Sequence, residues 1–173
     1  MRTLLYGAAC SLDGFIAGPN HEVDWLHWSD DVAAISKTVF DRVDTVLMGR
    51  KTYDAAVRMG TRAYPGVTNY VFSGTLAPEA APEVNVVAAD AVTFVRALKE
   101  QPGAGICLLG GGELARSLLD ADLIDELGVN MQPVLLGSGI PLLPGASRRH
   151  ALKLIESRPI AADSVYILYR VER

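Results

Sequence analysis

The feature that most limits what this chain can fold into is a regular alternation of short apolar runs with amphipathic segments. Short apolar runs are typical of buried strands, and apolar residues that recur every three or four positions are typical of helices. Alternation of this kind predicts an α/β fold whose mostly parallel sheet carries helices on both faces. Ser29 is the expected N-cap of the first helix. Strands are expected at residues 3–10, 45–48, 69–72, 84–87, 106–109 and 125–130, and helices at 30–42, 52–58, 91–100 and 113–120.

The C-terminal tail departs from this alternation. Residues 150–173 contain two stretches of strand-like composition, separated by a turn near Ala161, Ala162 and Asp163. Such a pattern predicts an antiparallel hairpin, which makes the sheet mixed. No repeat, low-complexity tract or linker interrupts the 173 residues. We therefore expect a single domain over residues 1–173.

Composition and charge exclude several classes of protein. Half of the residues are hydrophobic and 21% are charged, which is the balance of a folded globular protein. The net charge of −4 provides no basic field for nucleic acid or an anionic membrane, and every apolar run is shorter than the ~18 residues of a membrane span. The first apolar run lacks a signal-peptide cleavage site, so we expect a cytoplasmic protein. Cys10 and Cys107 lie in apolar runs and are expected to be free, buried thiols.

Three consecutive glycines, Gly110, Gly111 and Gly112, separate the strand expected at 106–109 from the helix expected at 113–120. The N–H groups and dipole of a helix N-terminus attract anions, so a pyrophosphate is the expected ligand. The motif is neither a P-loop, which needs Gly-Lys-Ser/Thr, nor a Rossmann fingerprint with its spaced glycines. The alternative is a tight turn that binds no ligand.

A second junction of this type follows the strand expected at 45–48. Gly49 ends the strand, and Arg50 and Lys51 begin the next helix, where the dipole disfavours cations. An anion between these charges would explain them; the alternative is two solvated surface cations. Two anion sites in one sheet fit a dinucleotide, with its pyrophosphate at the glycine triplet and a ribose 2′-phosphate near Arg50 and Lys51. This arrangement favours NADPH.

Several short motifs together resemble the dihydrofolate reductase-like superfamily. They are SLDGFIAG at 11–18, LMGRKTY at 47–53, FSG at 72–74 and LLGGGELARSLL at 108–119. The stretch DLIDELGVNMQPVLLGSGIPLL at 122–143 is especially similar to the reductase domain of bacterial riboflavin biosynthesis, the C-terminal half of the bifunctional deaminase-reductase. The resemblance implies a three-layer fold, NADPH as hydride donor, a homodimer and, as in many relatives, a cis Gly-Gly peptide.

The resemblance also assigns residues to the cofactor. It places Ala9 and Ile16 beside the nicotinamide, and Ser73 and Gly74 beside the adenine. The ribose phosphate is assigned to Gly49, Arg50, Lys51 and Thr52, and the pyrophosphate to Gly110, Gly111, Gly112, Glu113, Leu114 and Ala115.

The substrate side departs from both relatives. Ala33 stands where dihydrofolate reductases carry an acidic residue, and Phe15 stands where riboflavin-type reductases usually carry lysine. Asp13, beside the expected nicotinamide, is either a turn-former, or else a polar anchor for the substrate or the catalytic proton source. The aromatic residues near Trp28 either pack as a lid or stack on a flat substrate. Phe15, Trp28 and Asp31 are the residues expected to contact the substrate.

These patterns together predict a reductase. We expect hydride transfer from NADPH to a small heteroaromatic, carbonyl or imine substrate, as in the riboflavin-pathway pyrimidine reductase but not in a true dihydrofolate reductase. The alternative is a non-catalytic, NADPH-binding sensor or scaffold. The three histidines have no ligand spacing, so no metal is expected.

Overall fold

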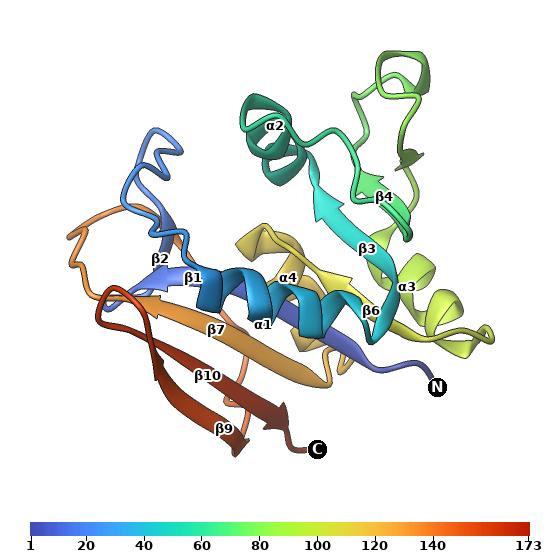
Figure 1. Cartoon of the computed structure of the whole chain (residues 1–173). Helices are drawn as coiled ribbons and strands as arrows, with labels where there is room; N and C mark the ends of the chain where they lie inside the picture. Colours follow the sequence, from blue (N-terminus) through green and yellow to red (C-terminus); the bar gives the residue numbers. More distant parts are fainter.

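A computed structural model describes residues 1–173. Its main sheet has eight strands in the order β5-β4-β3-β6-β1-β7-β10-β9 (Figure 1). The first six strands of this order, from β5 through β4, β3, β6 and β1 to β7, are all parallel to their neighbours. β10 pairs antiparallel with both β7 and β9. The predicted mixed α/β sheet with a C-terminal hairpin is therefore confirmed. The strands are β1 (Leu4–Ser11), β3 (Val43–Gly49), β4 (Thr68–Phe72), β5 (Asn85–Val87), β6 (Gly105–Leu108), β7 (Glu126–Gln132), β9 (Leu152–Ile160) and β10 (Ser164–Val171).

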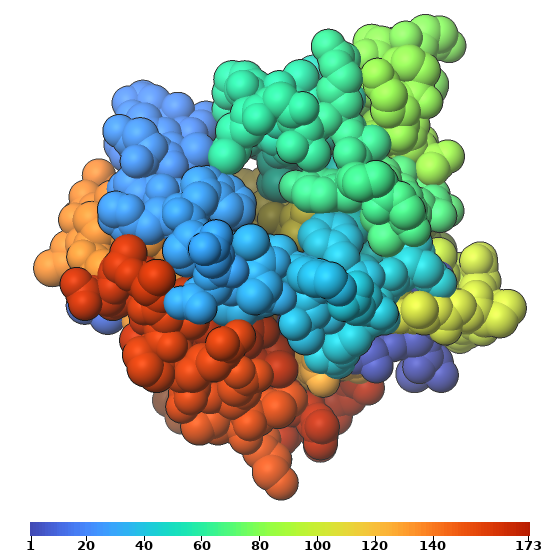
Figure 2. Space-filling view, viewed as in Figure 1, coloured from blue at the N-terminus to red at the C-terminus, as the bar shows by residue number.

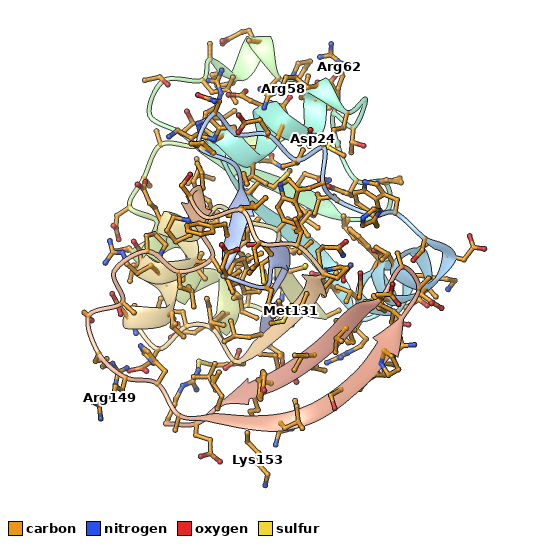
Figure 3. The ribbon with its side chains drawn as sticks, turned by 90° about the vertical axis from the view of Figure 1, so that its left-hand side faces the viewer. Asp24, Arg58, Arg62, Met131, Arg149 and Lys153 are labelled. Atoms are coloured by element: carbon orange, nitrogen blue, oxygen red, sulfur yellow. The ribbon has the colours of Figure 1, made fainter.

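Four α-helices cover the two faces of the sheet, as predicted. They are α1 (Asp30–Phe40), α2 (Arg50–Arg58), α3 (Ala91–Glu100) and α4 (Gly112–Asp120). Apolar residues of α3 and α4 pack on one face of the sheet, and those of α1 and α2 pack on the other. Figure 3 shows the layers edge-on, with α1 and α4 on opposite sides of the sheet. The N-cap predicted for α1 is present, because Ser29 Oγ accepts a hydrogen bond of 3.3 Å from Val32 N.

A buried lysine fastens α3 to the edge of the core. Lys99 is 1% exposed, and its ammonium donates to Leu123 O at 2.6 Å and to the Asp125 carboxylate. The same carboxylate accepts from Leu4 N at 2.7 Å and from the Arg173 guanidinium at 2.7 Å. A buried charge is tolerated only when it is paired and hydrogen-bonded, so this network is structural.

Three small elements were not predicted from the sequence. β2 (Phe15–Ala17) and β8 (Ile140–Pro141) form a separate two-stranded antiparallel sheet, and a short 3₁₀ helix covers Pro78–Ala80. Segments of two or three residues are too short for a periodic pattern, so only their tertiary pairing reveals them. Both cysteines are free and buried, as expected. None of the helices has the length and apolar character needed to cross a membrane.

Candidate active site

A cavity of about 1330 Å³ opens on the face of the sheet that carries α1 and α2. Its wall includes the middle of β1, the ends of β3 and β6, the starts of α2 and α4, and the inner side of α1. Figure 2 shows the surface hollowed between the blue segment around α1 and the green α2, with yellow atoms at the bottom of the hollow. Pockets for a single small ligand typically measure about 300–1,000 Å³, so this cavity can hold a dinucleotide together with a second molecule.

The two glycine junctions meet at this cavity. Because β3 and β6 are parallel neighbours, both end at the same edge of the sheet. Gly49 N donates a hydrogen bond of 2.7 Å to Gly110 O, and the Gly110–Gly111 peptide is cis. The helices that follow, α2 and α4, therefore begin side by side, and residues of both first turns line the cavity. Two helix N-termini that open into one space favour an anionic ligand there.

The three glycines of the triplet meet different constraints. Gly110 has a φ of +123°, a conformation that residues with a side chain rarely adopt. A Cβ on Gly112 would lie 3.0 Å from Leu142 O and still closer to Pro141 O. Gly111 has an extended φ of −89°, and a Cβ there would meet only Thr52 Oγ1, at 3.5 Å. The fold itself therefore requires Gly110 and Gly112, whereas Gly111 leaves open space on the cavity wall.

The predicted cations lie on the wall of the same cavity. Arg50 Nε donates to both carboxylate oxygens of Asp54, at 2.8 and 2.9 Å, which directs the side chain while leaving its terminal nitrogens without an ion pair. Lys51 is exposed and forms no ion pair. Positive charge thus gathers at the start of α2, with Glu113 of α4 as the only acidic residue on the cavity wall.

The structure brings only part of the predicted set to the cavity. Of the residues expected to bind cofactor or substrate, those on the wall are Ala9, Ile16, Trp28, Gly49, Arg50, Lys51, Thr52, Gly111, Gly112, Glu113 and Leu114. Those away from the wall are Asp13, Phe15, Asp31, Ser73, Gly74, Gly110 and Ala115. Gly110 and Ala115 are buried behind the wall, and Ser73 Oγ accepts from Leu76 N at 3.0 Å within the turn after β4.

Asp13 holds two loops together. Its carboxylate accepts hydrogen bonds from Ser11 Oγ at 2.6 Å, from Gly137 N at 2.7 Å and from Leu136 N at 3.1 Å. The Ser11 hydroxyl, helped by the two backbone amides, holds the pKa of Asp13 below its usual value. The side chain is therefore ionised at neutral pH and lies off the cavity wall. This arrangement fits a turn-former and not a proton donor.

Phe15 and Asp31 also serve other parts of the fold. Phe15 pairs with Pro141 in the small sheet formed by β2 and β8. Asp31 Oδ2 accepts a hydrogen bond of 2.8 Å from Ala161 N, which ties the first turn of α1 to the β9–β10 turn. Neither residue lines the cavity, so we do not retain them as substrate contacts.

Sequence reasoning missed the residues that form the inner half of the cavity. Its floor contains Gly7 of β1 and Gly128 of β7, which are paired in register. Tyr166 lies on β10, the neighbour of β7 in the sheet, where it pairs with Asn130 of β7. Glycines inside strands signal a close approach of some other group, but only the register shows that these two adjoin. The wall on the α1 side comprises Val32, Ala33, Ile35, Ser36, Val39 and Phe40.

Comparison with known proteins agrees with this architecture. A sequence model of the RibD C-terminal domain matches residues 2–166. The uncharacterized protein YwjB of Bacillus subtilis (strain 168) is 36% identical over 156 residues, which cover 88% of each chain.

Many solved structures share the fold, and two of them illustrate the likeness. A protein from Shewanella sp. PV-4 named for riboflavin biosynthesis superposes with a TM-score of 0.85 at 28% identity, covering 99% of both chains. Dihydrofolate reductase from Enterococcus faecalis, complexed with NADP(H), gives a TM-score of 0.74 at 18% identity, with 99% of this chain and 97% of that chain covered. The second likeness concerns the fold alone.

Proposed function

Because the chain belongs to the RibD C-terminal domain family, we propose that it is an NADPH-dependent reductase of the riboflavin type. Its substrate is a small heteroaromatic, carbonyl or imine compound. The observation that carries this proposal is the meeting of α2 and α4 at one cavity, with Arg50 and Lys51 at the start of α2 and the open backbone of Gly111 at the start of α4.

The residues present fit the cofactor. The open space at Gly111 and the N–H groups at the start of α4 suit a pyrophosphate. Arg50, Lys51 and Thr52 suit a ribose 2′-phosphate, because a guanidinium binds phosphate through paired hydrogen bonds. Ala9 and Ile16, on the wall of the same cavity, would border the nicotinamide. When bound there, NADPH supplies the hydride.

The chain's own residues then position the substrate and exclude water. The side of α1 that faces the cavity is mainly aliphatic, and Ala33 offers no carboxylate to a pterin ring. Substrate would enter between α1 and the floor of Gly7 and Gly128. This arrangement favours an enzyme other than a true dihydrofolate reductase.

The test measures binding and turnover separately. Calorimetry of NADPH and NADH should show tighter binding of NADPH. NADPH oxidation at 340 nm with a panel of pteridines, pyrimidines, quinones and ketones should then identify a substrate class. Equal affinity for the two cofactors would refute the cofactor assignment. NADPH binding without turnover of any panel member would favour the non-catalytic sensor.

We also propose that the protein forms a homodimer through the outer strand of the hairpin. Edge strand β9 exposes Leu152, Leu154 and Ile155 at 42%, 52% and 44%, and Val165 of β10 is 36% exposed. Figure 3 shows the hairpin at one side of the molecule with Lys153 pointing outward. Edge strands with exposed apolar residues pair readily with another chain, and a second copy is the partner that the family resemblance implies.

A further inference from the structure

The inner half of the cavity has a flat floor. Gly7 and Gly128 pair directly across the neighbouring strands β1 and β7, so two side chains are absent from the same point of the sheet. Val32, Ile35 and Val39 of α1 pack against Leu5 and Tyr166 on this face of the sheet. A space between bare backbone and aliphatic side chains fits a planar ring.

Tyr166 places one hydroxyl above this floor. Its Oη lies 3.1 Å from the position that a Cβ of Gly128 would occupy, so the missing side chain of Gly128 makes room for the hydroxyl. The Tyr166 residue is 7% exposed and lines the cavity, yet its hydroxyl has no hydrogen-bond partner, whereas Tyr6 Oη donates to Leu142 O at 3.1 Å. His150 Nε2 is the one fully buried side-chain polar atom without a partner, so the Tyr166 hydroxyl, although its ring is buried, is open to the cavity and available to a ligand.

The register relates Tyr166 to the proposed position of the nicotinamide. Ala9 pairs with Asn130, and Asn130 pairs with Tyr166, so the three residues form one row across β1, β7 and β10. Neighbouring strands lie about 4.8 Å apart, so the backbone of Tyr166 is about 10 Å from that of Ala9. The Tyr166 hydroxyl lies over Gly128, whose partner Gly7 is two residues from Ala9 on β1, so one carbonyl group between them can face both the nicotinamide and the hydroxyl.

No charged residue lines this half of the cavity, and the charges near Tyr166 belong to two ion pairs off the wall, Arg42–Glu126 and Arg158–Glu156. The charged residues on the wall, Arg50, Lys51 and Glu113, all belong to the first turns of α2 and α4, and His21 lies in the loop after β2. The polar groups of the inner half are neutral: Ser36, Tyr64, Asn130 and Tyr166. Because an unpaired charge is costly to bury, this half favours an uncharged ligand over a phosphorylated or carboxylated one.

We propose that the inner half of the cavity binds an uncharged, planar carbonyl compound and that Tyr166 donates the proton to its oxygen. This inference rests on the proposed function. The carbonyl carbon receives the hydride that NADPH supplies, and the C=O π electrons move to the oxygen. That oxygen takes the proton from Tyr166 Oη, so the ketone becomes an alcohol and NADPH becomes NADP⁺. Solvent water returns a proton to the phenolate.

Two features of its surroundings suit Tyr166 to this role. Burial raises the pKa of the hydroxyl, so it holds its proton at neutral pH until the oxygen of the substrate gains charge. The Arg158 guanidinium, 5.9 Å from the centre of the ring, and Arg42 favour the phenolate that remains after transfer, against the carboxylates of Glu156 and Glu126, which oppose it.

The experiment compares two ligands that differ by one charge. Isatin is a planar, uncharged ketone, and isatin-5-sulfonate is its anionic analogue. Titration of the protein with NADPH, followed by nicotinamide fluorescence, comes first and tests the proposed function alone. NADPH oxidation at 340 nm is then followed with each ketone. We expect turnover of isatin, and kcat/KM at least about tenfold lower for the sulfonate.

The kinetics of single-residue variants test whether Tyr166 is the proton donor. Tyr166→Phe should lower kcat for isatin by about 10²–10⁴-fold, the usual contribution of a general acid, with the Kd for NADPH and the KM for isatin within threefold of wild type. Gly128→Ala, whose Cβ would lie 3.1 Å from Tyr166 Oη, should displace the hydroxyl and also lower kcat. Tyr169→Phe is the matched control, because Tyr169 lies on the same strand but packs on the opposite face of the sheet.

The outcomes separate the two proposals. Failure of wild type to bind NADPH refutes the proposed function. NADPH binding without isatin turnover, or equal turnover of both ketones, refutes the substrate class. Tyr64 also lines the cavity, so Tyr64→Phe is measured as well. Unchanged kcat in Tyr166→Phe, or a loss of kcat confined to Tyr64→Phe, refutes the assignment of Tyr166 and leaves the reductase proposal standing.

Discussion

The middle glycine of the triplet offers the sharpest test of the cofactor site. We predict that Gly111→Ala weakens NADPH binding while the protein stays folded, and that Gly111→Val abolishes binding. The backbone at Gly111 is extended, with φ −89° and ψ −176°, so a side chain is tolerated there. An added Cβ would meet only Thr52 Oγ1, at 3.5 Å, which is an ordinary contact distance.

The magnitude follows from what the added atom excludes. A Cβ on the cavity wall at the start of α4 would hold a pyrophosphate away from the backbone N–H groups. Each charge-assisted hydrogen bond lost is worth about 1.5–3 kcal/mol, and 1.4 kcal/mol is about tenfold in Kd. Loss of one such bond should therefore raise the Kd of Gly111→Ala for NADPH by roughly 10–100-fold.

The assay is isothermal calorimetry with NADPH, accompanied by thermal unfolding followed by circular dichroism. Gly112→Ala is the matched control, because its Cβ would lie 3.0 Å from Leu142 O and still closer to Pro141 O. Such overpacking should cost about 1–3 kcal/mol of stability, so Gly112→Ala should unfold at lower temperature, whereas Gly111→Ala should not. A folded Gly111→Val protein that binds NADPH with wild-type affinity would show that the triplet is only a turn.

Three further predictions test the remaining assignments. Arg50→Ala should remove about 1.5–3 kcal/mol of the preference for NADPH over NADH, measured by calorimetry with both cofactors; an undiminished preference would place the 2′-phosphate elsewhere. Dihydrofolate should be reduced weakly or not at all, because Ala33 supplies no general acid, a group that typically raises the rate about 10²–10⁴-fold. Turnover of dihydrofolate at about 1 per second or faster would contradict this prediction. Leu154→Lys, on the outer strand, should shift the protein from dimer to monomer in light scattering, and a wild-type monomer would refute the proposed interface.

Local sequence information determined most of the secondary structure. The predicted helix at 91–100 has the same bounds as α3, and α1 begins after the predicted cap at Ser29. Hydrophobic periodicity and capping act between residues close in sequence, so they can be read before the fold is known. The two glycine junctions were found for the same reason, since each lies where a strand passes directly into a helix.

Tertiary structure decided which side chains line the half of the cavity proposed for the substrate. The sequence predicted that Asp13 acts as proton source and that Asp31 contacts the substrate. In the structure their carboxylates instead accept hydrogen bonds from backbone N–H groups of distant loops, Gly137 N and Ala161 N respectively. Tyr166 faces the cavity only because β10 pairs antiparallel with β7 in one register, which puts its hydroxyl above Gly128. A shift of one residue would turn every side chain of the strand to the other face of the sheet. Strand composition predicted the hairpin; the pairing of strands far apart in the chain selected which of its side chains reach the cavity.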